Sequence, residues 1–210
     1  MPPYTITART WEPAVLRGAT ESCSTETDAE DAQLLCQLCA GDHDALATLY
    51  RRHAAGLLSY LRRFLDQPEI AEEVLQDTFL NAWRSARSFA GRSTVRVWLL
   101  GIARRQAMNR LRRDGAVPPL IPLEDEQVTT ADDPAALVQA QLDRDELAAA
   151  VRTLSSLHRE VLGLLLVDQL SYAEIAAVLE VPIGTVRSRV SNARHRLAAQ
   201  LRAARSERDE

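Results

Sequence analysis

The segment from Leu170 to Val190, LSYAEIAAVLEVPIGTVRSRV, constrains the fold more than any other part of this 210-residue chain. Ser171 and Glu174 have the spacing of a capping box, in which both side chains satisfy free amide groups at the start of a helix. Leu170 and Ile175 stand where a hydrophobic staple packs. A helix is therefore predicted to begin at Ser171, and the following EVPIG to end it and form a turn. Two short helices around a tight turn are typical of a helix-turn-helix, which places its second helix in a DNA groove.

The second helix of this motif is predicted to have one apolar and one polar side. Thr185 is expected to cap it through its hydroxyl, and the buried stripe is predicted to consist of Val186, Val190, Ala193 and Leu197. Residues 181–205 contain six Arg and no acidic residue, which suits contact with phosphates and guanine. A solvated face that is merely rich in Arg is the alternative. The predicted DNA contacts are Thr185, Arg187, Ser188, Arg189, Ser191, Asn192, Arg194, His195 and Arg196.

Helical periodicity also dominates the rest of the chain, and no alternating strand pattern appears. We predict an all-α protein of two small helical domains joined by an acidic flexible linker. The predicted units are a disordered tail at 1–30, a helical domain at 31–113, the linker at 114–142 and the helix-turn-helix domain at 143–204. Gly41 and Pro68 are expected to separate helices within the first domain.

The net charge of −4 conceals a strong segregation of charge along the chain. Residues 95–113 contain six Arg and no acidic residue, whereas residues 114–145 contain eight acidic residues and one Arg. The basic segments fit a nucleic-acid partner despite the acidic average. No apolar run is long enough to span a membrane and no secretion signal is visible, so we expect a cytoplasmic protein.

Two long segments together resemble a known family. DAQLLCQLCAGDHDALATLYRRHAAGLLSYLRRFL and AEEVLQDTFLNAWRSARSFAGRSTVRVWLLGIARRQAMNRLRR resemble region two of the extracytoplasmic-function (ECF) sigma factors of bacterial RNA polymerase. LSSLHREVLGLLLVDQLSYAEIAAVLEVPIGTVRSRVSNARHRL resembles region four of the same family, in the same order. The resemblance implies a protein that binds core RNA polymerase, directs transcription initiation at particular promoters and helps to melt them. A helix-turn-helix regulator with an N-terminal helical sensor or interaction domain is the alternative.

The resemblance also implies roles for particular residues. Contact with the coiled coil of the polymerase β′ clamp would come from an acidic helix face, Glu69, Glu72, Glu73, Gln76 and Asp77, opposite an inner stripe of Ala71, Val74, Leu75, Thr78 and Ala82. Contact with the promoter minus-10 element would come from Phe89, Arg92, Arg96, Arg104, Arg105 and Asn109, and contact with the minus-35 element from the second helix of the motif. A solvated acidic face is the alternative for the first set, and a place in the core is the alternative for Phe89 and for Trp98. The family also implies an anti-sigma partner and no small-molecule substrate.

Two positions depart from the family pattern. Arg105 stands where relatives often have Asn, which puts a base-specific contact there in doubt, and Glu180 stands in the turn where many relatives have Gly.

Metal binding and catalysis have little support in the sequence. Cys36, Cys39 and His43 have a spacing found among zinc ligands, with Cys23 or His53 as a fourth ligand, but the cysteines could equally be small core residues. We predict no metal, no cofactor and no enzymatic activity, because no catalytic motif is visible.

Overall fold

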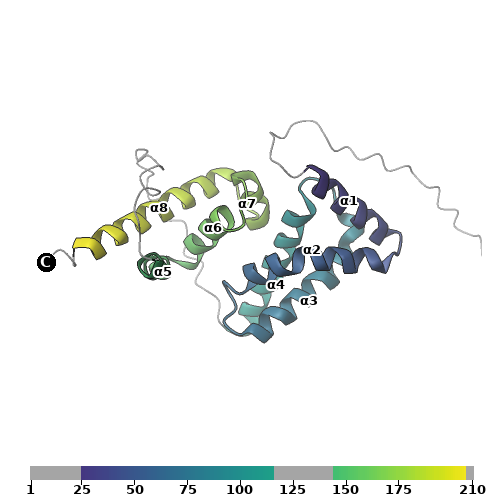
Figure 1. The fold of residues 1–210 in the computed structure, drawn as a ribbon, viewed down its shortest axis with the longest axis horizontal. Helices are drawn as coiled ribbons and strands as arrows, with labels where there is room; N and C mark the ends of the chain where they lie inside the picture. Colours follow the sequence, from purple (N-terminus) through teal and green to yellow (C-terminus); the bar gives the residue numbers. More distant parts are fainter. Residues whose placement is uncertain (1–24, 116–143, 207–210) are drawn as a thin grey trace, which may run out of the picture.

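The computed structural model describes residues 25–115 and 144–206, and within these ranges all regular elements are helices (Figure 1). The first group comprises α1 (Thr25–Cys39), α2 (His43–Leu61), α3 (Pro68–Ser85), the short 3-10 helix η1 (Ala86–Ser88) and α4 (Val95–Arg113). The second comprises α5 (Arg144–Thr153), α6 (Ser156–Leu166), α7 (Tyr172–Leu179) and α8 (Ile183–Ser206). The prediction of an all-helical chain with two domains is confirmed for the described residues, whereas the predicted linker, apart from Asp114 and Gly115, lies outside them.

Local signals fix the helix boundaries of the first domain. Gly41 has a φ of +99°, which permits the turn between α1 and α2, and the Asp42 side chain accepts a hydrogen bond from the amide of Asp44 to cap α2. Pro68 occupies the first turn of α3, where its missing amide hydrogen costs nothing. Thr94 caps α4 by accepting a hydrogen bond from the amide of Val97. The predicted breaks at Gly41 and Pro68 are confirmed.

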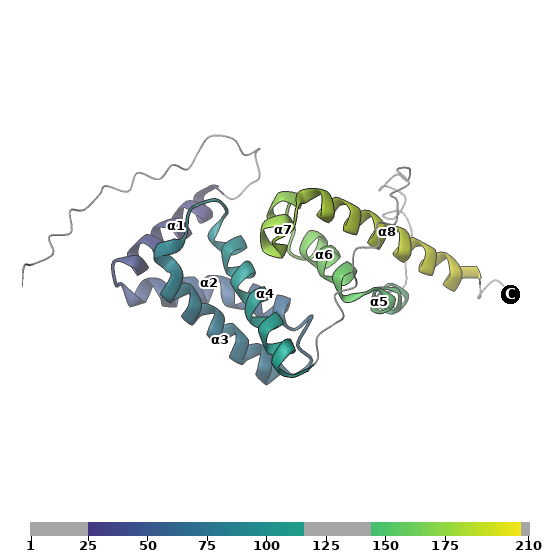
Figure 2. The same cartoon turned by 180° about the vertical axis from the view of Figure 1, so that it is seen from behind.

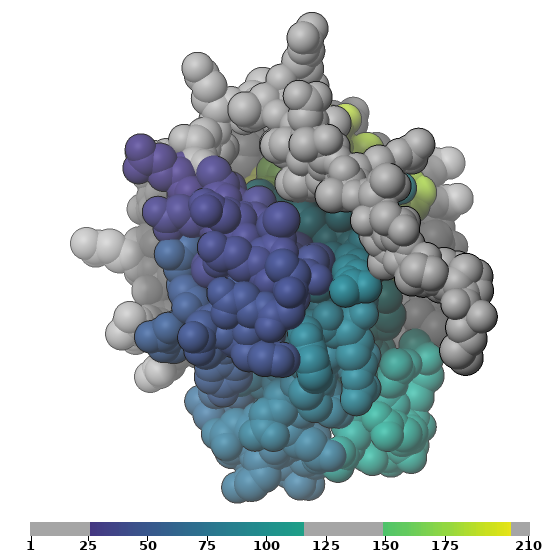
Figure 3. All heavy atoms as spheres, turned by 90° about the vertical axis from the view of Figure 1, so that its right-hand side faces the viewer, coloured from purple at the N-terminus to yellow at the C-terminus, as the bar shows by residue number. Residues whose placement is uncertain are grey.

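Helix α1 begins at Thr25, earlier than the predicted end of the tail at residue 30. Within α1, the buried carboxylate of Asp31 binds Arg52 at 2.9 Å and His53 at 2.7 Å on α2. These two contacts attach α1 to the domain. In a view from the α1 side, the surface of α1 lies directly beside that of η1 and the start of α4 (Figure 3).

The core of the first domain lies between α2, α3 and α4. Tyr60 and Leu61 of α2 and Leu99 of α4 are almost fully buried. The predicted inner stripe of α3 is confirmed, since all of its members are buried, Ala71, Val74, Leu75, Thr78 and Ala82. The opposite face of α3 is left for contacts outside the domain.

The second domain contains the predicted helix-turn-helix, formed by α7 and α8. The Ser171 hydroxyl accepts a hydrogen bond from the amide of Glu174, and the Glu174 carboxylate accepts one from the amide of Ser171, so the capping box is confirmed. Glu180 ends α7 in the left-handed conformation, with a φ of 56°. The apolar stripe of α8 is also confirmed, because its four predicted members are buried, Val186, Val190, Ala193 and Leu197.

One local prediction for α8 is wrong. Thr185 does not cap the helix, because α8 already begins at Ile183 and the carbonyl of Pro182 accepts hydrogen bonds from the amides of Thr185 and Val186. The fixed φ of Pro182 favours the start of a helix immediately after it. Thr185 is therefore the third residue of α8.

The two domains pack against each other along α4 and α7, as the views from front and back both show (Figures 1 and 2). The domains that carry the two basic helices, α4 and α8, are therefore in direct contact. It also decides which of the predicted binding residues are exposed.

Candidate nucleic-acid interface

Helix α8 presents a polar face opposite its buried stripe. Arg187, Ser191, His195 and Arg196 are exposed, and Arg189, Asn192 and Arg194 are partly exposed. The Ser188 hydroxyl donates a hydrogen bond to the carbonyl of Thr185 at 3.0 Å. The capped helix α7 and the buried stripe hold this face in position, and a helix with such a face fits a major groove.

The loop before α4 and the first turns of α4 hold a second set of predicted DNA contacts. Arg92 is exposed next to Gly91, whose φ of 64° requires a residue that tolerates the left-handed region. Phe89 and Trp98 are both partly buried against the core, and their ring centroids are 5.2 Å apart. The structure thus gives Phe89 a packing partner within the domain, while Arg92 faces solvent.

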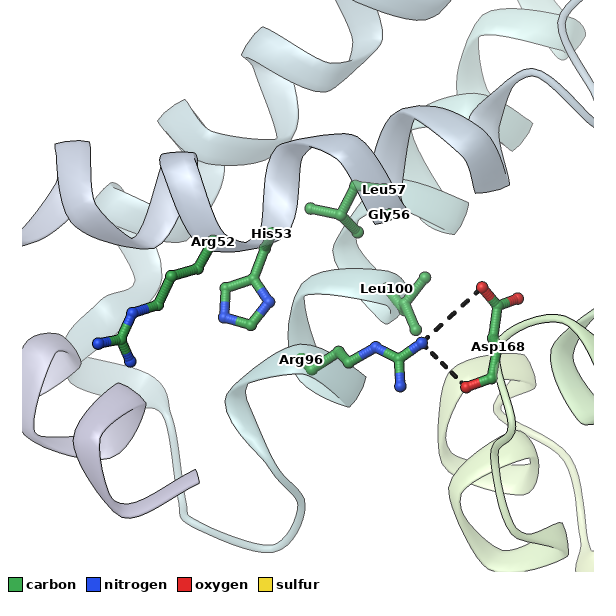
Figure 4. Close-up of a pocket in the computed structure, with 7 residues that line it drawn as sticks. All are labelled: Arg52, His53, Gly56, Leu57, Arg96, Leu100 and Asp168. Atoms are coloured by element: carbon green, nitrogen blue, oxygen red, sulfur yellow. Dashed lines mark hydrogen bonds and ion pairs between the residues drawn. The ribbon is translucent and has the colours of Figure 1, made fainter. Parts of the chain in front are cut away.

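The remaining predicted arginines of α4 are bonded to the second domain. The Arg104 Nε donates to Glu160 Oε1 at 2.8 Å, and an Arg105 guanidinium nitrogen donates to Glu180 Oε1 at 2.8 Å. Arg96 donates to the carbonyl of Asp168 at 2.9 Å and lies 3.9 Å from its carboxylate (Figure 4). The two positions that depart from the family pattern, Arg105 and Glu180, are therefore partners of each other.

Glu160 on α6 and Asp168 after it are buried charged residues that the sequence did not single out. Glu160 is 5% exposed and Asp168 is 6% exposed. Glu160 accepts a hydrogen bond from the Tyr60 hydroxyl at 3.0 Å in addition to the bond from Arg104. Burial and the nearby Glu160 carboxylate raise the pKa of Tyr60 well above its usual value, so the phenol stays protonated as the donor.

Arg63, in the turn that follows α2, makes the second contact to Asp168. Its Nε and one terminal nitrogen are buried without a hydrogen-bond partner in the described part of the chain. Gly163 on α6 makes room for this guanidinium, because a Cβ atom at position 163 would lie only 2.6 Å from an Arg63 nitrogen. Gly163 of α6 thus leaves space for the Arg63 side chain, and Asp168 after α6 binds its guanidinium group.

The edge of the α8 face also lies close to this network. Burial lowers the pKa of the Arg189 guanidinium, Glu160 opposes that effect and the Arg104 cation adds to it. Arg189 and Arg104, predicted to contact different promoter elements, therefore lie near each other and near the same carboxylate.

The acidic stripe of α3 faces away from the core. Glu69, Glu72 and Gln76 are exposed, while Glu73 forms an ion pair with Arg110 at 2.7 Å. Asp77 is partly buried.

Exposed apolar residues continue this stripe. Leu80 and Trp83 are each 42% exposed, and they follow Glu73 and Gln76 at helical spacing. The sequence prediction missed them, although the same spacing that placed the carboxylates would have found them. Together Glu69, Glu72, Gln76, Leu80 and Trp83 form a mixed surface that we call the α3 face.

The cysteines do not form a metal site within the described ranges, where no cluster of three His, Cys, Asp or Glu suits a metal ion. Cys36 is exposed, so the interpretation of this residue as a small core residue is wrong. Cys39 is partly buried, and burial together with Cys36 raises the pKa of its thiol. His43 packs instead against the Trp83 ring at a centroid distance of 5.6 Å. Cys23 lies outside the described residues.

Comparisons with known proteins identify both domains. Residues 49–117 match the model of Sigma-70 region 2, and residues 144–197 match the model of Sigma-70 region 4. The chain is 33% identical to the RNA polymerase sigma-H factor of Pseudomonas aeruginosa, over 80% of this chain and 92% of that protein. It is 32% identical to the ECF RNA polymerase sigma-E factor of Escherichia coli strain K12, over 78% of this chain and 90% of that protein.

Solved structures show the same fold in complexes. The structure of CnrH with the cytosolic domain of CnrY has a TM-score of 0.59 and 27% identity, and covers 82% of this chain and 97% of that chain. The sigma factor RpoE of Bartonella quintana with the anti-sigma factor NepR has a TM-score of 0.52 and 26% identity, and covers 85% of this chain and 98% of that chain.

A chain with both sigma regions in this order is a transcription initiation protein rather than a regulator with a separate sensor domain. The chain belongs to the ECF sigma factors of RNA polymerase. Among the described residues no helix is long and apolar enough to cross a membrane.

Proposed function

We propose that this sigma factor holds a promoter at two points, with α8 on the minus-35 element and with α4 and its preceding loop on the minus-10 element. The observation that carries the proposal is the pair of arginine-rich helices without acidic residues, one in each domain. Such helices bind the phosphate backbone, and the polar groups between the arginines read the bases.

On α8, Ser191 and Asn192 are the base-reading candidates, because hydroxyl and amide groups match the donors and acceptors of the major groove. Arg187, Arg194 and Arg196 lie beside them and are suited to contact phosphates. Arg189 is partly exposed and is a further candidate for a phosphate contact.

On the first domain, Arg92 and the loop around it would receive the displaced strand of the melted minus-10 element. Arg96, Arg104, Arg105 and Asn109 extend this basic surface along α4. Strand separation requires cations that bind the single-stranded backbone and a loop that accepts an unstacked base.

The α3 face is proposed as the surface for the β′ clamp coiled coil of core RNA polymerase. Its carboxylates supply charge complementarity, and Leu80 and Trp83 supply the apolar contact on which stable interfaces depend. Asp77 and Glu73 flank this surface.

An anti-sigma factor is a further proposed partner, since the related RpoE was solved with one. The chain is proposed to act in the cytoplasm, where the polymerase works. The sigma factor supplies recognition and melting, and the polymerase performs the chemistry of RNA synthesis.

Run-off transcription with purified core polymerase tests this function. A library of genomic fragments from the source organism is transcribed with the wild-type chain and with a variant carrying Ser191→Ala and Asn192→Ala. The wild type is expected to start transcription at discrete sites that share two sequence elements, and the variant is expected to change or lose the upstream element. Initiation without a shared upstream element would contradict the proposed role of α8.

A further inference from the structure

The contact between the two domains is built from the proposed DNA-binding cations of α4 and carboxylates of the second domain. Arg104 binds Glu160, Arg96 binds the backbone and lies near the carboxylate of Asp168, and both carboxylates are buried. The same guanidinium groups are proposed to bind promoter phosphates. Oxygen atoms of Glu160 and of the Asp168 backbone therefore bind guanidinium groups that the proposed function assigns to DNA.

The surfaces of the two domains are also complementary in shape and in hydrogen bonding at this contact. Tyr60 of α2 donates to Glu160, Arg63 in the turn after α2 donates to Asp168, and Gly163 leaves the space that Arg63 fills. Buried carboxylates are costly unless they are paired and hydrogen-bonded, and both carboxylates obtain their pairing from the other domain. Separation of the domains would return them to water, where this pairing is no longer required.

Closure affects the second DNA-binding surface as well. Arg189 on α8 is partly buried, and its pKa is lowered by burial and by the Arg104 cation of the other domain, while Glu160 opposes the shift. Of the cations of α4 that bind the second domain, Arg104 is the least exposed, so closure limits the access of DNA to Arg104 in particular.

We propose that the free chain inhibits itself by closing the two domains, with Glu160 and Asp168 occupying the α4 arginines in place of DNA phosphates. Inhibition by closure rests on the proposed function of these arginines as contacts to DNA. Promoter DNA favours the open form because it binds the arginines that closure pairs with carboxylates. The exposed pair between Arg105 and Glu180 contributes little to closure, because each side chain is 62% exposed.

The two states compete for the same cations, so the apparent affinity for DNA is lowered by the fraction of chains that are open. If about one chain in ten is open, a variant that cannot close binds DNA about tenfold more tightly than the wild type. Its molecular dimensions also increase, because the domains separate.

The test uses full-length chain without polymerase. Glu160→Gln with Asp168→Asn removes both buried charges, and Glu26→Gln with Asp66→Asn is the control, since it removes two exposed carboxylates that lie outside every proposed site. The two variants have the same net charge. Small-angle X-ray scattering gives the radius of gyration, and fluorescence anisotropy gives the affinity for a labelled single-stranded 20-mer of random sequence.

A third variant, Gly163→Leu, obstructs Arg63 without a change in charge, and leucine favours a helix more than glycine does at this position of α6. Circular dichroism establishes that each variant retains the helical content of the wild type.

The charge-neutralised variant and Gly163→Leu are expected to have a larger radius of gyration and a higher DNA affinity than the wild type. The control is expected to keep the radius of the wild type. It should show only the small gain in affinity that its change in charge confers. Equal dimensions and affinities for the control and both opening variants would overturn the proposal. Run-off transcription separates this failure from failure of the proposed function: a wild-type chain that initiates at promoters but shows no opening refutes closure alone.

Discussion

Replacing Arg187 and Arg196 on α8 with Ala is expected to weaken promoter binding by the polymerase holoenzyme in a way that depends on salt. Both side chains are exposed on the polar face of α8 and belong to the proposed phosphate contacts. Their removal leaves the buried stripe intact, so the fold of the second domain is expected to persist.

The magnitude follows from the release of counterions. Each lost phosphate contact reduces the magnitude of the slope of log affinity against log salt concentration by about 0.9. The slope of the double variant should therefore be shallower than that of the wild type by about 1.8. Between roughly 50 and 200 mM salt, the advantage of the wild type over the double variant should therefore fall about tenfold.

The assay is fluorescence anisotropy of holoenzyme on a labelled promoter fragment, measured over this range of salt concentrations. Arg152→Ala with Arg202→Ala is the matched control, because both residues are exposed arginines of the second domain outside the proposed site. Arg202 lies on α8 itself, about 22 Å along the helix axis from Arg187. An equal loss of slope in the control would show a general effect of charge and would refute the assignment of the α8 face.

Three further predictions concern the capping box, the α3 face and Tyr60. Ser171→Ala should lower the free energy of unfolding by about 1 kcal/mol, seen as a lower melting temperature in circular dichroism, and an unchanged melting curve would contradict the role of the cap. Glu69→Gln with Glu72→Gln should weaken the binding of core polymerase in a titration, whereas equal affinity would exclude these carboxylates from the interface. The raised pKa of Tyr60 means that its protonated form is favoured in the folded chain, so its contribution to stability is present below about pH 10 and is lost at higher pH. Tyr60→Phe cannot lose a phenol proton, so this variant should lose less stability than the wild type as the pH rises above about 10. Identical alkaline unfolding of the two proteins would contradict the role given to Tyr60.

Local signals made most of the fold predictable from the sequence. The capping box at Ser171, the breaks at Gly41 and Pro68 and the inner stripe of α3 each depend on residues within one or two helical turns of one another. The start of α1 could not be predicted in this way. Helix α1 is held to the domain by contacts between residues far apart in the chain, such as those of Asp31 with Arg52 and His53 of α2.

The interface between the domains was not predictable from the sequence, because its partners are far apart in the chain. Glu160 and Tyr60 are separated by 100 residues, and neither belongs to a motif. In the sequence Glu160 and Asp168 resemble ordinary surface carboxylates, but in the structure both are buried and bonded to residues of the first domain. The same packing pairs Arg105 with Glu180, a relation that no local spacing could indicate.

Cross-linking in the open promoter complex tests the two-point grip most directly. A photoreactive amino acid is placed at the exposed positions 92 and 191 in turn, and the cross-linked bases are mapped on promoter DNA bound by the holoenzyme. The account predicts that position 191 cross-links near the minus-35 element and position 92 near the minus-10 element. Cross-links from both positions to one element, or from neither to promoter DNA, would contradict it.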